Sequence, residues 1–407
     1  ETWPVREIPD ALEWERFNDV PIGIVTGTNG KTTTVRFAKH ILRMAGHNVG
    51  VSSTDWIAVN ERIIDRDDWS GPGGARAVLR EQDVDIAILE TARGGLLRRG
   101  LGVERAAAAL ITNISEDHLG DFGSRNLDEL LAIKWVVSHA VREAGRLILN
   151  AEDHRLVARS KNYDGELIWF SLDPANDTVT GHIASGGTAF VLDGDQLLKV
   201  ENTERELICR ASEIPLALGG AARHNVANAL SAAALTWCLG TSLANIRTGL
   251  TSMKQDENPG RCNIYELNGF KVLIDFAHNP AAMGALFDMA SAIPAERRAL
   301  CFGQAGDRTD DLIRELARDA WAIGLDRVLV SELAKYYRGR EPGEVFDVIS
   351  NELKSLGATD DQIRHNDEEL ETLEDALSWA QPGDLVIMLA LGGATPIQER
   401  LRELGAE

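Results

Sequence analysis

Residues 25–34, VTGTNGKTTT, contain most of a phosphate-binding loop. In the common form of that loop, G-x-x-x-x-G-K-[ST], the first glycine would fall at Val25. Gly27 and Gly30 still allow the backbone to close on an anion, Lys31 can contact the β- and γ-phosphates, and the Thr32 hydroxyl can bind Mg²⁺. The missing glycine shortens the motif and removes none of these groups. We therefore predict phosphate binding at this loop.

Three further residues could complete a site around that loop. Glu90 ends the apolar run DIAILE, where a carboxylate beside a phosphate loop can join the ligands of Mg²⁺. His118 lies in TNISEDHL, after the next apolar run, and we expect it beyond the same sheet edge as Glu90. Lys134, in AIKW, falls on a predicted helix, where a lysine is usually only a solvated charge. The pattern predicts a phosphate and metal site in which Lys134 is the least obvious member.

The elements that must position these residues alternate between strands and helices. An apolar run at 22–26 precedes the loop, and apolar residues at helical spacing follow it at 31–45, so the loop opens a helix. Further strands are predicted at 49–53, 85–90, 108–113 and 146–150, with helices at 73–80 and 127–144. This alternation predicts an α/β fold with a parallel, doubly wound central sheet.

The pattern changes twice further along the chain. Residues 167–214 form short runs broken by SGG and DGD, which predicts a small antiparallel insertion, and helical spacing returns at 224–239 and 244–253. QDENPGR then has the composition of a linker. Strands predicted at 272–276, 298–302, 327–331 and 384–390, with helices between them, indicate a C-terminal Rossmann-like α/β domain. We therefore divide the chain into a P-loop central domain, 1–257, and a C-terminal domain, 258–407.

The composition is that of a folded protein with an acidic surface. The 407 residues are 44% hydrophobic and 26% charged, and the formal net charge is −21. Such a charge opposes binding to nucleic acid or to an anionic membrane, and it suits a cationic substrate or serves only solubility. Four scattered cysteines, without a C-x-x-C pair, argue for reduced, buried thiols. With no apolar run of membrane-spanning length and no signal-peptide pattern, we expect a cytoplasmic protein.

The motifs in their order resemble the ATP-dependent Mur ligase family. GTNGKTTT, Glu90, TNISEDHL and Lys134 are followed by HNVANALSAAA, NPGR, DFAHNP and GDR, so the resemblance covers nearly the whole chain. The shortened phosphate loop is that family's own form. Within the family, ETARGGLLRRGLG, the SGP stretch at 70–72 and YRGREPGEV most resemble the C-terminal Mur-like part of cyanophycin synthetase. That enzyme joins the α-amine of arginine to an aspartate side chain.

The resemblance implies ATP and Mg²⁺ as cofactors and assigns roles residue by residue. Lys31 and Thr32 would hold the phosphates and a first Mg²⁺ with Glu90 nearby, and His118 would help to bind a second. Lys134 matches a lysine that is carbamylated in many relatives. Nucleotide-binding roles are implied for Gly27, Thr28, Asn29, Gly30, Lys31, Thr32, Thr33, Asn225 at the adenine, Arg261 at the phosphates and Asp275 at the ribose.

The same resemblance implies a carboxylate substrate and an amino-acid amine, which are joined through an acyl phosphate with release of ADP and phosphate. We expect Thr54, Arg93, His278 and Asn279 at the substrate side of the site. The segment ELAKYYRGREPGE follows a predicted strand end, so Arg338 or Arg340 could bind a carboxylate as a fork. Glu332, Glu341 or Glu344 could accept a guanidinium or ammonium group.

The chain also departs from its relatives. The residues before position 25 are too few for the domain that binds a UDP-linked substrate, and the ATP-grasp part of cyanophycin synthetase is absent. We therefore expect a free-standing ligase, with an excised piece as the alternative. A polyglutamate-type ligase and an ATP-binding module without catalysis remain open as functions. A homo-oligomer is one option for the assembly.

Overall fold

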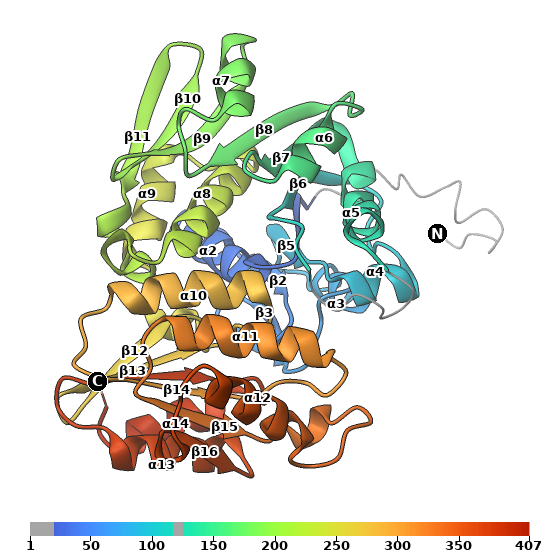
Figure 1. Cartoon of the computed structure of the whole chain (residues 1–407). Coiled ribbons are helices and arrows are strands. Elements are labelled where there is room, and N and C mark those ends of the chain that lie inside the picture. Colours follow the sequence, from blue (N-terminus) through green and yellow to red (C-terminus); the bar gives the residue numbers. More distant parts are fainter. Residues whose placement is uncertain (1–19, 117–124, 407) are drawn as a thin grey trace.

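Two β-sheets, each covered by helices, make up the protein. The computed structural model describes residues 20–116 and 125–406. Figure 1 shows the N-terminal sheet and its helices above the C-terminal sheet, with helix α10 (Pro280–Ala292) at the level where the two parts meet. This confirms the predicted α/β class with a separate C-terminal α/β part.

Eleven strands of the described chain form the first sheet, in the order β11-β10-β9-β8-β7-β6-β1-β5-β2-β3-β4. Its centre is parallel, because β1 pairs in parallel with both β5 and β6. The strands are β1 (Ile22–Thr26), β2 (Val49–Ser52), β3 (Ile57–Val59), β4 (Arg62–Asp65), β5 (Ile86–Glu90), β6 (Ala106–Ile111), β7 (Val141–Asn150), β8 (Glu166–Ser171), β9 (Thr188–Asp193), β10 (Gln196–Glu201) and β11 (Glu204–Arg210).

Helices pack on both faces of this sheet, since its central strands are apolar on both sides. One face is covered by α2 (Lys31–Met44), α8 (Arg223–Cys238) and α9 (Leu243–Ser252). The other packs against α5 (Leu127–Trp135), α6 (His154–Ser160) and α7 (Asp177–Ala184). The short helix α3 (Pro72–Val78) packs against β2, β3 and β5, and the short helix α4 (Arg93–Arg99) contacts α3 and α5. The carboxyl ends of β1, β5 and β6 therefore meet at one sheet edge, where open α/β sheets bind ligands.

Two predictions for this sheet need correction. The predicted helix at 127–144 ends early: a 3₁₀ helix follows at Val136–Ala140, and β7 begins at Val141. Pairing of β7 with β6, which starts at Ala106 opposite Val141, overrides the helical pattern. The region 167–214 does contain the antiparallel strands β9–β10–β11, but they extend the main sheet, and β8 joins them in parallel.

The C-terminal sheet has the order β12-β13-β17-β14-β15-β16 among the described residues. All neighbours are parallel except the β12–β13 hairpin, which the sequence did not predict. Helices α10, α11 and α12 share one apolar core with the sheet, and α13 and α14 share the core on its other face. The elements are β12 (Asn263–Leu267), β13 (Phe270–Asp275), β14 (Arg298–Phe302), α11 (Asp310–Ala322), β15 (Arg327–Ser331), α12 (Glu344–Ser355), β16 (Ile363–Asn366), α13 (Glu369–Trp379), β17 (Leu385–Leu389) and α14 (Ala394–Glu403).

Two further sequence expectations can be compared with the structure. The four cysteines form no disulfide in the described chain, and Cys209, Cys262 and Cys301 are buried. Within residues 20–116 and 125–406, no helix has the length and apolarity that a bilayer crossing requires.

Candidate functional site

The phosphate loop lies between β1 and α2 and owes its shape to two glycines. Gly27 has φ 146° and Gly30, which precedes the first residue of α2, has φ 84°. A Cβ on Gly27 would lie 1.9 Å from Thr112 Oγ1, and one on Gly30 would lie 2.2 Å from Asn228 Oδ1. Val25, which occupies the place of the usual first glycine, is a fully buried residue of β1. The loop therefore begins at Gly27, directly after the strand, and the positive φ angles of Gly27 and Gly30 are the ones that require glycine.

The segment that follows β6 holds the loop in place. Thr112 Oγ1 donates to the Asn29 carbonyl at 2.6 Å, and Asn113 accepts from the Asn29 amide at 2.9 Å while donating to the same carbonyl at 3.1 Å. The Thr28 amide donates to the Asn113 carbonyl at 2.9 Å. From the sequence, only the histidine of TNISEDHL was predicted to be functional. The hydrogen bonds by which Thr112 and Asn113 hold the phosphate loop were not predicted. His118 itself lies outside the described residues.

Two lysines donate hydrogen bonds to carbonyl groups of the loop. Lys31 Nζ donates to the Thr28 carbonyl at 2.8 Å. Lys134 Nζ, from α5, donates to the Gly27 carbonyl at 2.6 Å, although Lys134 is only 4% exposed. The structure thus brings Lys134 to the phosphate loop, where its charge adds to that of Lys31.

Glu90 ends β5 next to the first helical turn after the loop. It is 1% exposed and accepts hydrogen bonds from Thr32 Oγ1 at 3.1 Å and from Thr54 Oγ1 at 2.7 Å. The Thr54 amide donates to its second carboxylate oxygen at 3.2 Å. Thr54 therefore orients the carboxylate, and it also lines the larger cavity described below; its substrate contact stays a prediction.

The donor set fits Mg²⁺. Adjacent oxygens of an octahedral Mg²⁺ shell lie about 3 Å apart, which the Thr32–Glu90 pair matches at 3.1 Å. Within the described ranges no cluster of three histidine, cysteine or acidic side chains could hold a metal. Mg²⁺ usually takes one or two protein ligands and completes its shell with water and phosphate. The Glu90 carboxylate and the Thr32 hydroxyl beside a phosphate loop are consistent with this coordination preference.

A cavity of about 610 Å³ extends from the loop to the C-terminal sheet. Residues of both sheets line it, including Asn225 of α8, Asp275 of β13, and Arg261, His278 and Thr33. The sequence reasoning had placed all five at the nucleotide or substrate, and they do lie around one space. Its size suits a nucleotide-sized ligand.

Several of these side chains are fixed by internal hydrogen bonds. Asn225 is 1% exposed and donates to the Leu216 carbonyl at 2.9 Å. Asp275 accepts from the Cys262 amide at 2.8 Å. The Arg261 guanidinium lies over the Phe276 ring, 4.2 Å from its centroid. These contacts hold the side chains of the cavity wall in fixed positions.

Cys262 and His224 form a buried pair at the same wall. His224 Nε2 lies 3.0 Å from Cys262 Sγ, and Cys262 has φ 53°, in the left-handed region. Burial lowers the pKa of His224, with the charge of Asp275 opposing the shift. Burial also raises the pKa of the Cys262 thiol well above its ordinary value, and Asp275 raises it further. The pair is therefore uncharged at neutral pH.

One amide pair joins the phosphate loop directly to the C-terminal part. Asn29 Nδ2 donates to Asn279 Oδ1 at 3.2 Å, and Asn279 Nδ2 donates to Asn29 Oδ1 at 2.9 Å. Asn279 is fully buried, and its side chain also caps α10 by accepting from the Ala282 amide. The neighbouring His278 Nδ1 lies 3.0 Å from the Phe276 carbonyl. The phosphate loop is thus hydrogen-bonded to the residue that caps the start of α10.

A second connection between the two parts involves Arg36, which the sequence reasoning missed. Arg36 of α2 has a side chain that is only 2% exposed, and it donates to Asn258 Oδ1 at 3.1 Å and to the Pro259 carbonyl at 3.0 Å. It also pairs with Asp55 at 2.5 Å. The NPGR linker is therefore attached to the phosphate-loop helix just before Arg261. A single arginine on an amphipathic helix gives no sequence signal for such a contact.

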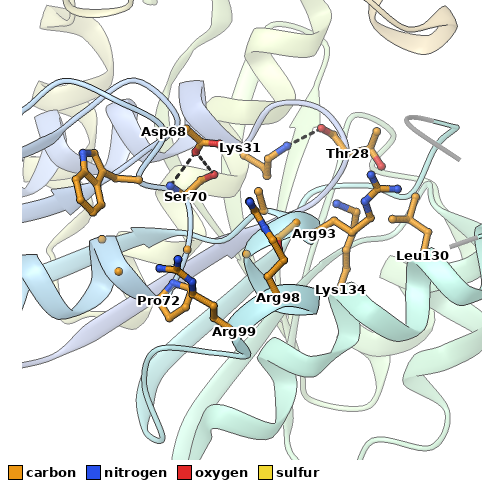
Figure 2. Close-up of a pocket in the computed structure, with 17 residues that line it drawn as sticks. Thr28, Lys31, Asp68, Ser70, Pro72, Arg93, Arg98, Arg99, Leu130 and Lys134 are labelled. Atoms are coloured by element: carbon orange, nitrogen blue, oxygen red, sulfur yellow. Dashed lines mark hydrogen bonds between the residues drawn. The ribbon is translucent and has the colours of Figure 1, made fainter. Parts of the chain in front are cut away.

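A second cavity, of about 420 Å³, adjoins the first at Thr28 and Lys31. Figure 2 shows Arg93, Arg98 and Lys134 around it, together with Asp68 and Ser70. The expected Arg93 lies here, whereas Arg98 and Arg99 were not predicted as site residues. The sequence RGGLLRRG did contain a signal for these two residues, because it places three arginines on one short helix.

Arg338 and Arg340 lie apart from both cavity linings and are engaged inside the C-terminal part. Arg338 pairs with Asp307. Arg340 donates to the carbonyls of Gly306 and Arg308 and to Asp310 at 2.8 Å. The two arginines therefore attach their own loop to the GDR segment, and Glu332, which accepts from the Gly343 amide at 3.0 Å, holds the other side of that loop.

Comparison with known proteins gives matches along most of the chain. Residues 25–236 match the family model of the Mur ligase middle domain, and residues 260–392 match that of the Mur ligase, glutamate ligase domain. A cyanophycin synthetase from Crocosphaera subtropica is 34% identical over 371 residues, which are 91% of this chain and 42% of that protein. The chain thus spans less than half of that relative. The UDP-N-acetylmuramoyl-tripeptide--D-alanyl-D-alanine ligase of Escherichia coli is 27% identical over 78% of this chain and 66% of its own length.

Solved structures share the fold. MurF from Acinetobacter baumannii superposes with a TM-score of 0.68 at 17% identity, covering 95% of this chain and 78% of its own. E. coli FolC, solved in complex with ADP, superposes with a TM-score of 0.67 at 19% identity, covering 96% and 92%. The N-terminal part of the chain matches the middle-domain model, and the C-terminal part matches the model of the glutamate ligase domain. The chain belongs to the Mur ligase family.

Proposed function

We propose that the chain is an ATP-dependent carboxylate–amine ligase that forms an amide bond through an acyl phosphate, with release of ADP and phosphate. The observation that carries this proposal is that the two cavities share Thr28 and Lys31. One cavity has the size and lining of a nucleotide site, and the other is lined by arginines. A carboxylate in the second cavity would therefore lie next to the terminal phosphate of ATP in the first.

The chemistry requires two anions to meet. A carboxylate oxygen attacks the γ-phosphorus of ATP and ADP leaves; the amine nitrogen then attacks the acyl carbon, phosphate leaves, and the amine loses a proton. Lys31 and Lys134 supply positive charge where the first step takes place, and both are held by loop carbonyls. Such preorganised charge contributes on the order of 3 kcal/mol for each well-aimed contact.

The metal sites are assigned within the same proposal. Thr32 and Glu90 would hold Mg²⁺, which offsets the negative charge of the phosphates, and His118 would contribute to a second ion. Carbamylation of Lys134 would exchange its positive charge for a carboxylate near these ions. Its position beside Gly27 is compatible with the cationic form as an alternative.

The C-terminal part would close the nucleotide site. We assign Asn225 to the adenine side, Arg261 to the phosphates and Asp275 to the ribose, because all three line the larger cavity. We place the boundary between the two domains at residue 258, since no strand is shared between the sheets. Enclosure by both domains would keep water from the acyl phosphate.

For the substrates, we propose an aspartyl side chain as the carboxylate and arginine as the amine. The supporting observations are the similarity to cyanophycin synthetases and the net charge of −21, which favours a cationic amino acid. The loop that contains Arg338 and Arg340 is the part of the C-terminal domain that we expect to approach the amine. Glutamate is the alternative amine, because the C-terminal family model is that of glutamate ligases.

The test is ADP release by the chain with ATP, aspartyl peptides and either arginine or glutamate. We expect ADP release that depends on both an acid and an amine, and a product whose mass equals the two minus one water. Lys31→Ala should abolish the product. ADP release that never depends on added acid and amine, or undiminished amide formation by Lys31→Ala, would contradict the proposal.

A further inference from the structure

The thiol of Cys262 lies where the two parts of the protein meet, at the wall of the larger cavity. Cys262 directly precedes β12, the first strand of the C-terminal part, and is 6% exposed. Its two polar neighbours are His224, from α8 of the N-terminal part, and Asp275, at the end of β13. All three residues line the larger cavity. The sulfur therefore connects the two halves of the cavity wall.

The hydrogen bonds of this thiol have a defined direction. Cys262 Sγ lies 3.2 Å from Asp275 Oδ2 and 3.0 Å from His224 Nε2. An ionised carboxylate only accepts hydrogen bonds, so the thiol hydrogen points to Asp275. The sulfur then accepts from the neutral ring of His224, whose hydrogen must be on Nε2. The three side chains thus form one directed chain of hydrogen bonds from α8 to the carboxylate.

Asp275 is held through a single oxygen atom. The Cys262 amide also donates to Oδ2, at 2.8 Å. Because the thiol and the amide of the same residue both bind Oδ2, they fix the plane of the carboxylate and the direction in which Oδ1 points. Hydrogen bonds from a ribose hydroxyl to a carboxylate are strong, and they depend on that direction.

The backbone of Cys262 is strained. Its φ of 53° lies in the left-handed region, which a glycine enters readily and a residue with a side chain enters at a cost. Such a conformation persists where the surrounding contacts compensate for it. The hydrogen bonds of the Cys262 amide and thiol supply that compensation, and both are directed to Asp275.

We propose that Cys262 is a positioning residue, whose thiol links α8 to Asp275 and so aligns this carboxylate with the ribose hydroxyls of ATP. The inference rests on the proposed function, which assigns Asp275 to the ribose, and it goes further by naming the group that orients the carboxylate. The ribose hydroxyls do not change during phosphoryl transfer. The effect of Cys262 should therefore appear in nucleotide affinity and not in turnover at saturating ATP.

The experiment compares two nucleotides that differ only in the ribose hydroxyls. ATP and 2′,3′-dideoxy-ATP, each with Mg²⁺, are titrated into the intact chain by calorimetry, without acid or amine. We expect ATP to bind roughly tenfold more tightly than the dideoxy form. Cys262→Ala should reduce this preference to roughly threefold or less, whereas Cys262→Ser, which keeps a donor and an acceptor, should retain it. Cys301→Ala is the matched control, because it removes a buried thiol outside both cavity linings and should also retain the preference.

A second variant keeps the test decisive should Cys262→Ala fail to fold. Cys262→Gly removes the thiol and relieves the backbone strain, so it should fold and show the same reduced preference. A full preference in Cys262→Gly, its loss in Cys262→Ser or Cys301→Ala, or equal binding of both nucleotides to the unmodified chain would overturn the inference. ADP release that depends on an acid and an amine would then leave the proposed ligase function standing. Failure of the unmodified chain to bind ATP at all would instead contradict that function.

Discussion

Replacing Arg36 by methionine should destabilise the protein by about 2–4 kcal/mol. The change retains the apolar stem of the side chain and leaves Asn258 Oδ1 and the Pro259 carbonyl without their buried donor. Each such acceptor costs about 1–3 kcal/mol. Relief from burying a charge offsets part of that sum, since burial lowers the pKa of the Arg36 guanidinium to about 10. The ion pair adds little, because the Asp55 side chain is 41% exposed.

Urea unfolding followed by tryptophan fluorescence measures this loss. Arg62→Met is the matched control, because Arg62 also forms an ion pair at this sheet but its side chain is 55% exposed, so we expect a change of about 0–1 kcal/mol. The Arg36 variant should in addition raise the KM for ATP more than it lowers kcat, since the linker leads directly to Arg261. A loss no larger than that of the control, with an unchanged KM, would refute the reasoning that Arg36 attaches the linker.

Further predictions concern the site and its pH dependence. Glu90→Gln removes the charge beside Thr32 and should lower the rate of ADP formation at saturating ATP at least roughly 100-fold; near-normal turnover would exclude Glu90 from the metal site. Asn279→Ala should raise the KM for ATP several-fold and cost about 1 kcal/mol. Asn176→Ala, which removes the cap of α7 and a hydrogen bond to the Ala151 carbonyl far from the phosphate loop, should cost a similar amount without changing KM. Burial lowers the pKa of His224 in the folded protein, so that the unfolded chain takes up the proton first as the pH falls. The contribution of neutral His224 to stability is therefore complete above about pH 6.5, the ordinary pKa of histidine, and is lost as the pH falls below that value. Urea unfolding at pH 7 and pH 5 should therefore show a smaller difference for His224→Gln than for the unmodified chain, and an equal difference would contradict this assignment.

The sequence predicted what depends on neighbours along the chain. The phosphate loop, the strand ending at Glu90 and the alternation of strands and helices have local signals, because glycine positions and apolar spacing record backbone shape and burial. The NPGR turn was identified as a linker for the same reason. In each case the relevant residues lie within a few positions of one another.

Long-range contacts could not be predicted in this way. The bonds from Thr112 and Asn113 to the phosphate loop join residues 83 and 84 positions apart, and the Asn29–Asn279 pair spans 250 positions. The sequence of one chain has no periodic pattern that relates residues separated by so many positions. The end of the helix before Val141 was misplaced for a related reason, because pairing with β6 decides the conformation there.

The outer strands of the eleven-stranded sheet bear on how the protein behaves at high concentration. Strands β4 and β11 each have one side without a neighbour in the described sheet, so their backbone groups could pair with another chain. β4 begins with Arg62 and ends with Asp65, and β11 begins Glu204-Arg205-Glu206. These charges oppose the pairing of either edge strand with an edge strand of another copy of the chain. Replacing the acidic residues of β11, for example with Glu204→Thr and Glu206→Thr together, would allow this edge strand to pair with another chain and so promote aggregation.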